Sequence, residues 1–210
     1  LGWESGTVRI EPSGKITVLT GTSPHGQGLE TAFAQIAADL LGVPMEDVAV
    51  LHGDTAIVAA GVGTFGSRSI SVGGPAIAAS VEKVLDKARR IAALLLEAAA
   101  EDVVFDQGRF AVRGAPGRAV TLAEVAAAAY AGKTLPAGME PGLDATTVWD
   151  PPNFTFPSGT HVAVVEVDAD SGAVRLLRLV GVDDCGRVIN PLLVEGQIHG
   201  GLAQGIGQAL

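Results

Sequence analysis

Two segments of this chain share one pattern: an alternating hairpin that turns at Ser-Gly, a polar loop, and a Gly-Gln pair near the start of a helix. The hairpins cover residues 7–21 and 161–186, and the Gly-Gln pairs are Gly26-Gln27 and Gly196-Gln197. Alternation of apolar and polar residues around a tight turn is typical of antiparallel strands. The pattern predicts an α+β fold of duplicated hairpin-plus-helix units with mixed or antiparallel sheets, rather than a doubly wound parallel sheet.

The rest of the chain divides into elements by the same criteria. Helical spacing predicts helices at about 26–42, 75–101 and 121–132, and a last helix after Asn190-Pro191; alternation predicts a strand within 47–54 and a hairpin over 102–114 turning at Gln107-Gly108. Residues 133–159 hold five of the eleven prolines. We therefore expect a first half at 1–132, a proline-rich linker at 133–159, and a second half at 160–210 that is truncated at its C-terminus.

Charge and cysteine content exclude several classes of function. The net charge of −9 opposes binding to nucleic acid or to an anionic membrane surface. No apolar run is long enough to span a membrane, and Cys185 is the single cysteine, so a disulfide or an all-cysteine metal site within the chain is excluded. We expect a cytoplasmic location, with any phosphate held mainly by backbone N–H groups.

The stretch GVGTFGSRS, residues 61–69, has its glycines in the spacing of a dinucleotide-binding turn. A nicotinamide site needs a preceding strand and an acidic residue about twenty positions later, at the end of the next strand. Residues 55–61 could form the first strand, but Glu82 and Asp86 lie within a helical pattern. Two other interpretations remain: an anion site formed by the loop and its Ser and Arg side chains, or a loop whose serines only cap a helix.

Glutamine and glycine also meet at the two expected helix starts. Gln27 lies between Gly26 and Gly28, where the chain can approach another surface closely and the amide offers both a donor and an acceptor. The last helix carries five glycines, each costing about 1 kcal/mol against alanine, which indicates close approach to a backbone or a ligand. Plain helix packing is the alternative interpretation.

These motifs together resemble a known family. The segments GTSPHGQGLETAFAQIAADLLG, HGDT, GTFGSRS and VDDCGRVINPLLVEGQIHGGLAQGIGQAL are similar to the molybdenum-binding large subunit of the xanthine dehydrogenase/aldehyde oxidase superfamily. Within that superfamily, these segments most resemble the carbon monoxide dehydrogenase-like large subunits. The resemblance runs in order along nearly the whole chain, and it implies a fold of the molybdenum cofactor-binding type.

The resemblance implies a cofactor and the residues that bind it. The cofactor would be molybdenum-molybdopterin cytosine dinucleotide. Gly26, Gln27 and Gly28 would face its pterin or molybdenum end. Gly66, Ser67, Arg68 and Ser69 would lie along the pyrophosphate or nucleotide, and Gln197 would bind from the other half. Cys185 and Asn190 are further candidates.

The resemblance also implies partners and a reaction. A molybdenum hydroxylase oxidises CO, an aldehyde or a heterocycle with oxygen from water, and passes electrons to an iron–sulfur (2Fe–2S) small subunit and an FAD-binding medium subunit. The family's catalytic glutamate and copper-binding cysteine would fall outside residues 1–210. We therefore expect no catalytic or metal-binding residue here and an inactive chain in isolation. Leu29 and the apolar run at 55–63 depart from the family pattern, and a non-catalytic interaction module of the same fold is the alternative.

Overall fold

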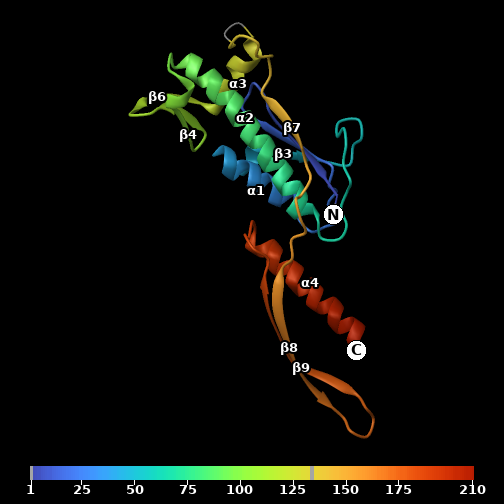
Figure 1. Cartoon of the computed structure of the whole chain (residues 1–210). Coiled ribbons are helices and arrows are strands. Elements are labelled where there is room, and N and C mark those ends of the chain that lie inside the picture. The colour runs from blue at the N-terminus through green and yellow to red at the C-terminus, as the bar shows by residue number, and fades with distance from the viewer. Residues whose placement is uncertain (1, 133–134) are drawn as a thin grey trace. The chain divides into compact units, whose positions relative to one another are not determined.

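The structure is a computed structural model that describes residues 2–132 and 135–210. The chain forms two compact units, residues 1–152 and 153–210, and each is described by itself. Their elements confirm the α+β class, and both units contain an antiparallel hairpin followed by a helix (Figure 1).

The first unit is built on a mixed four-stranded sheet with the strand order β3-β2-β1-β7. The strands are β1 (Glu4–Ile10), β2 (Ile16–Thr20), β3 (Val48–Leu51) and β7 (Asp144–Trp149). The predicted first hairpin is confirmed as the antiparallel pair β1–β2, whereas β3 runs parallel to β2. Alternate residues of β1 and β2, such as Val8 and Ile16, are buried in the core, as period-two burial predicts.

Two helices pack side by side against this sheet, α1 (Leu29–Leu41) and α2 (Gly74–Leu95) (Figure 1). Their apolar faces supply Phe33, Ile77 and Ile91, which are fully buried among the strand residues. A five-residue π-helix, η2 (Ser69–Gly73), leads directly into α2. The glycine motif at 61–69 therefore ends at the π-helix that leads into the longest helix of the unit.

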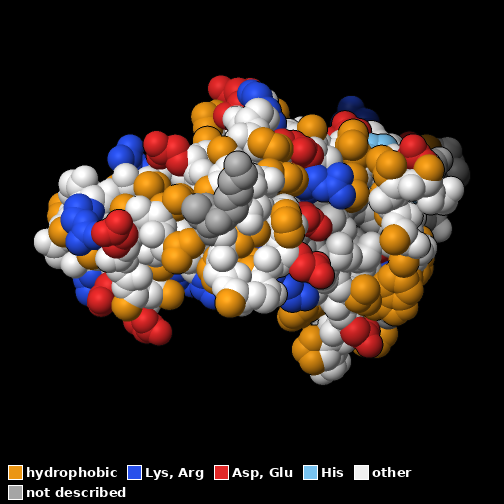
Figure 2. All heavy atoms as spheres, turned by 90° about the horizontal axis from the view of Figure 1, so that it is seen from above, with side chains coloured by type: hydrophobic (Ala, Val, Ile, Leu, Met, Phe, Trp, Pro, Cys, Tyr) orange, Lys and Arg blue, Asp and Glu red, His pale blue; other side chains and the backbone are white. Residues whose placement is uncertain are grey.

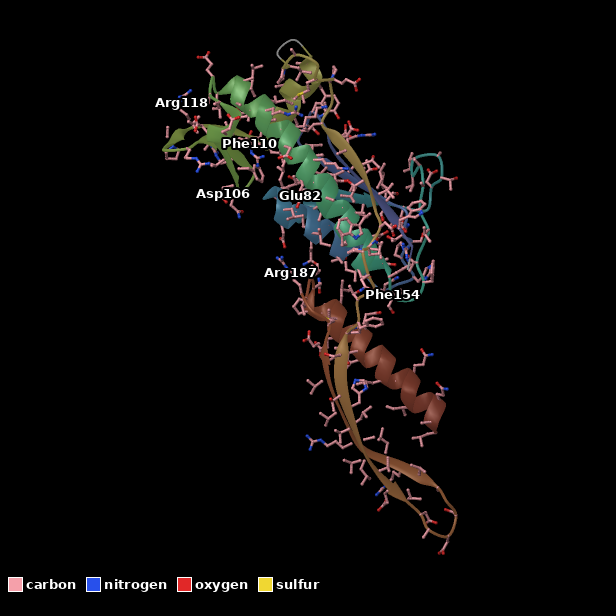
Figure 3. The ribbon with its side chains drawn as sticks, in the orientation of Figure 1. Glu82, Asp106, Phe110, Arg118, Phe154 and Arg187 are labelled. Carbon is pink, nitrogen blue, oxygen red and sulfur yellow. The ribbon has the colours of Figure 1, made fainter. Side chains whose placement is uncertain are left out.

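The helix predicted to reach residue 101 ends earlier, at Leu95. Glu97 adopts a left-handed backbone conformation, with φ 48°, and the amide of Ala98 donates to the carbonyl of Ala93. This is the Schellman arrangement that ends helices, with glutamate where glycine is usual. Arg118, labelled in Figure 3, donates to the carbonyl of Leu96 at the same helix end. The alanine-rich composition hid this stop, because it favours helix throughout.

A smaller antiparallel sheet lies beside α2 and α3 (Leu122–Ala131) and has the order β4-β5-β6. Its strands are β4 (Val103–Asp106), β5 (Arg109–Val112) and β6 (Ala115–Thr121). The predicted turn is confirmed: Gln107 and Gly108 both have positive φ, as the tight hairpin turns that match strand twist require. Helix α3 begins with a capping box formed by Thr121 and Glu124.

The segment 133–159 is not simply a linker. Lys133 and Thr134 lie outside the described residues, but residues 144–149 form β7, an edge strand paired with β1. The hydroxyl oxygens of Ser80 in α2 and of Thr147 lie within hydrogen-bond distance, 2.9 Å apart, which ties β7 to the core. The boundary between the two units falls within the segment, after Pro152. Local proline density masked a strand whose stability depends on its distant partner β1.

The second unit consists of the predicted hairpin and helix. Strands β8 (Ser158–Val167) and β9 (Val174–Asp184) turn at Ser171-Gly172, where hydrogen bonds from Ser171 hold the Asp168 carboxylate and lower its pKa. Helix α4 (Pro191–Ala209) begins after Asn190, whose side chain accepts a hydrogen bond from the Leu193 amide. Leu202 of α4 packs at Gly181 of β9.

Candidate functional site

Two loops that carry the predicted site residues meet in the first unit, 21–28 after β2 and 61–69 before α2. They touch through glycines: a Cβ built on Gly21 would lie 2.4 Å from the Cα of Gly61, and the converse holds. Ser5 also donates its hydroxyl to the carbonyl of Ala60. No side chain fits at either glycine, so the two backbones can approach only because both lack Cβ.

Thr64 connects the two loops by hydrogen bonds. Its hydroxyl oxygen accepts from the Ser23 amide at 2.8 Å and lies 2.9 Å from the Ser69 hydroxyl. Three positions in these loops are open, because a Cβ on Gly26, Gly63 or Gly66 would meet no atom within 4 Å. The pair of loops thus forms a fixed backbone surface with free space above its glycines.

Gln27 lies in the first loop, between two glycines of positive φ, and not within the helix that was expected to begin at residue 26. Gly28 is the residue before α1, and the side-chain oxygen of Gln27 accepts a hydrogen bond from the His25 amide. The HGDT loop lies beside it: Gly53 faces Ser23, and His52 Nε2 is 2.7 Å from a Glu30 carboxylate oxygen. Glu30 is therefore paired with a histidine on a neighbouring loop.

The second loop divides into exposed and buried residues. Gly66 and Ser67 are exposed and both have left-handed backbones, with φ 56° and 57°. Ser69 is buried with its hydroxyl at Thr64. Positive φ is rare for a residue with a Cβ, so the conformation of Ser67 must be imposed by its surroundings.

Arg68 requires a correction to the sequence analysis. We expected its guanidinium along a pyrophosphate, but its side chain is 0% exposed and pairs with Glu4 at 2.9 Å. It also donates to the carbonyls of Trp3 and Gly63. The guanidinium is occupied by the protein because a buried cation needs a counter-charge, and in this structure it holds the loop.

Sequence reasoning missed Glu4, the partner of Arg68. Its carboxylate is fully buried and also accepts hydrogen bonds from the amides of Ser5 and Gly63. One signal was available: Glu4 lies an even number of residues before Val8 and Ile10, so alternation puts it on their buried face. An acidic residue on the core face of a strand predicts a buried partner.

The candidates in the second unit are described within that unit alone. Gln197 is exposed on α4, and Asn190 caps that helix. Cys185 is an exposed free thiol. Asp183 faces His161 at 3.1 Å whereas Asp184 accepts from the Gly186 amide, so the two carboxylates do not form an acid pair.

A Cβ built on any of the five glycines of α4 would meet no described atom within 4 Å beyond the adjoining backbone of the helix itself. The close neighbour that they indicate is therefore not found within the described residues of the second unit. It stays a prediction about a ligand or further protein.

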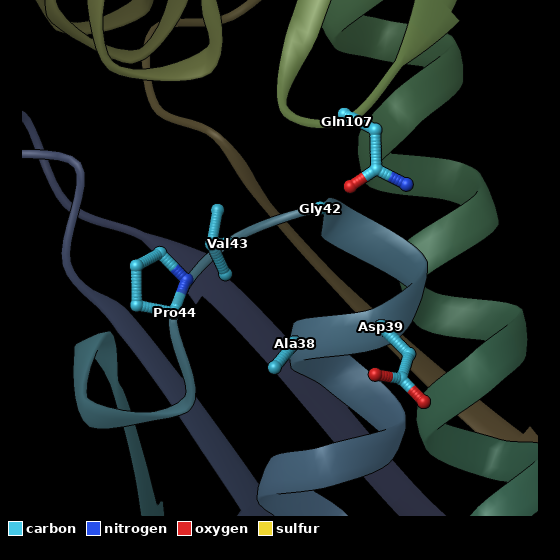
Figure 4. A pocket seen from close by; sticks show the side chains of 6 residues that line it. All are labelled: Ala38, Asp39, Gly42, Val43, Pro44 and Gln107. Atoms are coloured by element: carbon cyan, nitrogen blue, oxygen red, sulfur yellow. The ribbon is translucent and has the colours of Figure 1, made fainter.

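The first unit also has a hollow, seen from close by in Figure 4. It is at the C-terminal end of α1 and is lined by Ala38, Asp39, Gly42, Val43, Pro44 and Gln107. None of the predicted site residues lines it. Within the described ranges no group of three or more His, Cys, Asp or Glu side chains is placed to hold a metal ion. The candidate site is therefore the surface formed by the two loops.

The nicotinamide alternative does not agree with the local structure. Residues 52–60 form turns and irregular backbone rather than a strand leading into Gly61. The sheet is mixed, with one parallel pair.

On the face shown in Figure 2, Lys and Arg side chains are scattered among acidic ones. Over the described ranges no helix is long and apolar enough to cross a membrane.

Comparisons with curated proteins found relatives along nearly the whole chain. The chain is 44% identical over 208 residues to the carbon monoxide dehydrogenase large chain of Hydrogenophaga pseudoflava, covering 99% of this chain and 26% of that protein. It is 40% identical to the nicotine 6-hydroxylase large subunit of Paenarthrobacter nicotinovorans, with the same coverage. The chain thus spans about a quarter of the length of these curated relatives.

Solved structures show the same fold. Quinoline 2-oxidoreductase from Pseudomonas putida 86 superposes with a TM-score of 0.90 at 45% identity, covering 99% of this chain and 26% of that one. A Cu,Mo-CO dehydrogenase superposes with a TM-score of 0.89 at 42% identity, covering 95% and 25%. The family model described as "Molybdopterin cofactor-binding domain" matches residues 1–210. With its two glycine loops joined in one open surface, the chain belongs to the molybdopterin cofactor-binding domain family.

Proposed function

We propose that this chain is part of the cofactor-binding region of a molybdenum hydroxylase and that the cofactor is molybdopterin cytosine dinucleotide. One observation carries the proposal: Thr64 and the Gly21–Gly61 contact join the two glycine loops and leave open space above Gly26, Gly63 and Gly66. Backbone without Cβ atoms is what a ligand as large as a dinucleotide needs for close approach. The residues present therefore fit the group.

The proposed contacts follow the exposure of each residue. Gln27, with Gly26 and Gly28, would hold the pterin or molybdenum end through its amide group. Gly66 and Ser67 are exposed and would offer N–H and hydroxyl donors to the pyrophosphate, whereas Ser69 and Arg68 are buried and would hold the loop. Gln197 would bind the cofactor from the second unit. Neutral donors of this kind suit an anion bound by an acidic chain.

The bound cofactor would supply two-electron oxidation of a small substrate with water as the oxygen source. The substrate classes we propose are CO, an aldehyde or a heterocycle. Electrons would pass to FAD and 2Fe–2S groups on partner subunits. The residues of this chain would bind and orient the cofactor, and a glutamate elsewhere in the parent protein would handle protons.

The first experiment uses the full-length parent purified with its accompanying subunits. Molybdenum and the CMP released by acid hydrolysis are measured per protein. About one of each per large subunit supports the proposal. Absence of both, from cells that make the cofactor, contradicts it and favours a non-catalytic module.

A pair of matched variants then tests the proposed contact. Gln27→Asn shortens the side chain and is expected to lower molybdenum and CMP content together. Gln107→Asn makes the same change at the β4–β5 turn, where asparagine tolerates the left-handed backbone, and is expected to leave both at the parent level. Equal contents in the two variants would refute the role of Gln27.

A further inference from the structure

Glu4 and Arg68 form a buried ion pair that none of the proposed cofactor contacts uses. Both side chains are 0% exposed, and Arg68 Nη1 lies 2.9 Å from Glu4 Oε2. Burying two charges is costly unless each is fully hydrogen-bonded, and such a pair is weak evidence for stability alone. Its position at the base of the 61–69 loop indicates a role in setting the conformation of that loop.

The Glu4 carboxylate connects β1 to the beginning of the loop. Oε2 accepts from the Gly63 amide at 3.1 Å, and the Val62 amide lies 3.3 Å from each carboxylate oxygen. Oε1 also accepts from the Ser5 amide at 3.0 Å on the same strand. A single side chain thus fixes two successive loop amides relative to the sheet.

Arg68 connects the end of the loop to the same strand. Its Nη2 donates to the Trp3 carbonyl at 2.7 Å, and Nη1 donates to the Gly63 carbonyl as well as to Glu4. The loop is therefore held at 62–63 and again at Arg68, with both attachments meeting at Glu4. Gly66 and Ser67, the exposed residues with left-handed backbones, lie between these two fixed points.

We propose that Glu4 is a positioning residue for the cofactor site: through Arg68 and the amides of Val62 and Gly63, it imposes the left-handed Gly66-Ser67 backbone presented to a phosphate group. This inference rests on the proposed function. A left-handed serine persists only where its surroundings determine it, and strained residues of this kind gather at ligand-binding loops. Because Glu4 neutralises Arg68, the phosphate is held by neutral donors instead of the guanidinium.

The test replaces Glu4 by glutamine in the full-length parent with its subunits. Glu4→Gln keeps the size of the side chain but removes the charge that pairs with Arg68 and one of the two acceptor oxygens. We expect faster hydrogen exchange in peptides covering 61–69, and about tenfold or more loss of retained molybdenum and CMP. Unchanged exchange and unchanged cofactor content would overturn the inference.

Ser80→Ala is the matched control for general loss of stability. Ser80 donates to the Gly6 carbonyl on the same strand at 2.7 Å, and its hydrogen bonds among the described residues are to Gly6 and Thr147 rather than to the loop. We expect this variant to melt at a lower temperature and to keep both its cofactor and slow exchange at 61–69. If Ser80→Ala loses as much cofactor as Glu4→Gln at an equal melting temperature, Glu4 acts only on stability and the inference fails.

Arg68→Lys is a second variant that tests the same inference from the other side of the ion pair. It replaces Glu4→Gln as the test if that variant does not fold. Lysine keeps the positive charge but loses the fork that reaches Glu4 and Trp3 together, so we expect faster exchange at 61–69 and partial cofactor loss. Parent-level values for both readouts would overturn the inference. Higher cofactor content in Glu4→Gln would do the same, by showing that a released Arg68 binds phosphate. A parent without molybdenum and CMP refutes the proposed function instead.

Discussion

Individual residues determine whether the two site loops can meet. Gly21 and Gly61 are in direct backbone contact, and the Glu4 carboxylate fills the space beside them. Neither glycine has a positive φ, so their requirement is for space rather than for backbone freedom. Substitutions at these two positions therefore test the contact between the loops most directly.

Gly21→Ala tests this contact. The new Cβ would lie 2.2 Å from Glu4 Oε1 and 2.4 Å from the Gly61 Cα, and backbone cannot yield as a flexible side chain can. We expect the free energy of unfolding to fall by about 2 kcal/mol or more, measured by urea denaturation. Gly117→Ala, where a Cβ meets nothing within 4 Å, should change it by less than about 0.5 kcal/mol. Equal effects would contradict the close approach.

At the level of elements, the ends of two helices show how local chemistry stops a helix. Helix α2 ends where Glu97 adopts φ 48° in a Schellman arrangement, and α3 begins with a complete capping box. The end of α2 is strained, because Glu97 has a Cβ that disfavours a positive φ. The beginning of α3 is not strained, because side chains there accept hydrogen bonds from the free backbone amides.

Glu97→Gly removes the strain at the end of α2. Glycine adopts the left-handed conformation without steric cost, although it loses more chain entropy on folding. We expect a net gain of about 0.5 to 1 kcal/mol in the free energy of unfolding, measured by thermal or urea denaturation. Glu97→Ala, which keeps the strain, should give no such gain; an equal gain from alanine would count against the Schellman account.

The capping box of α3 makes a prediction about pH. Hydrogen bonds from the Thr121 amide and hydroxyl lower the pKa of Glu124 from 4.5. A lowered folded-state pKa means that this stabilisation is present above pH 4.5 and is lost as the pH falls through the lowered value. Glu124→Gln should therefore flatten the acid limb of the stability profile, and an NMR titration should place the Glu124 pKa below 4.5. A titration at or above 4.5 would refute the cap.

For the whole molecule, the second unit exposes much of its apolar surface. Its exposed side chains include Phe156 at 84%, Leu192 at 78% and Val182 at 68%. Phe154, labelled in Figure 3, stacks on Phe156 with ring centroids 6.2 Å apart. Exposed apolar patches of this kind mark surfaces that another protein covers.

We therefore expect the 210-residue chain on its own to self-associate. Light scattering or sedimentation at increasing protein concentration would detect the growth in mass. Replacing Phe154 and Phe156 by serine should reduce the association, because it removes the two stacked rings. A single monomeric species at all concentrations would contradict the prediction. Unchanged association after the replacement would show that Phe154 and Phe156 do not mediate it.

The sequence by itself determined what depends on neighbours along the chain. Alternation located the hairpins, helical spacing located the helices, and Thr121 and Asn190 marked helix starts, because these signals act within a few residues. The motifs also indicated the family, which the match over residues 1–210 confirmed.

Only the tertiary structure decided which distant residues meet. It paired β7 with β1, buried Arg68 against Glu4 and joined Ser23 to Thr64. Each of these depends on burial, because a buried charge or hydroxyl is stable only beside a partner brought by the fold. Residue type showed that Arg68 could bind an anion; only the packing of β1 against the 61–69 loop determined that this anion is Glu4.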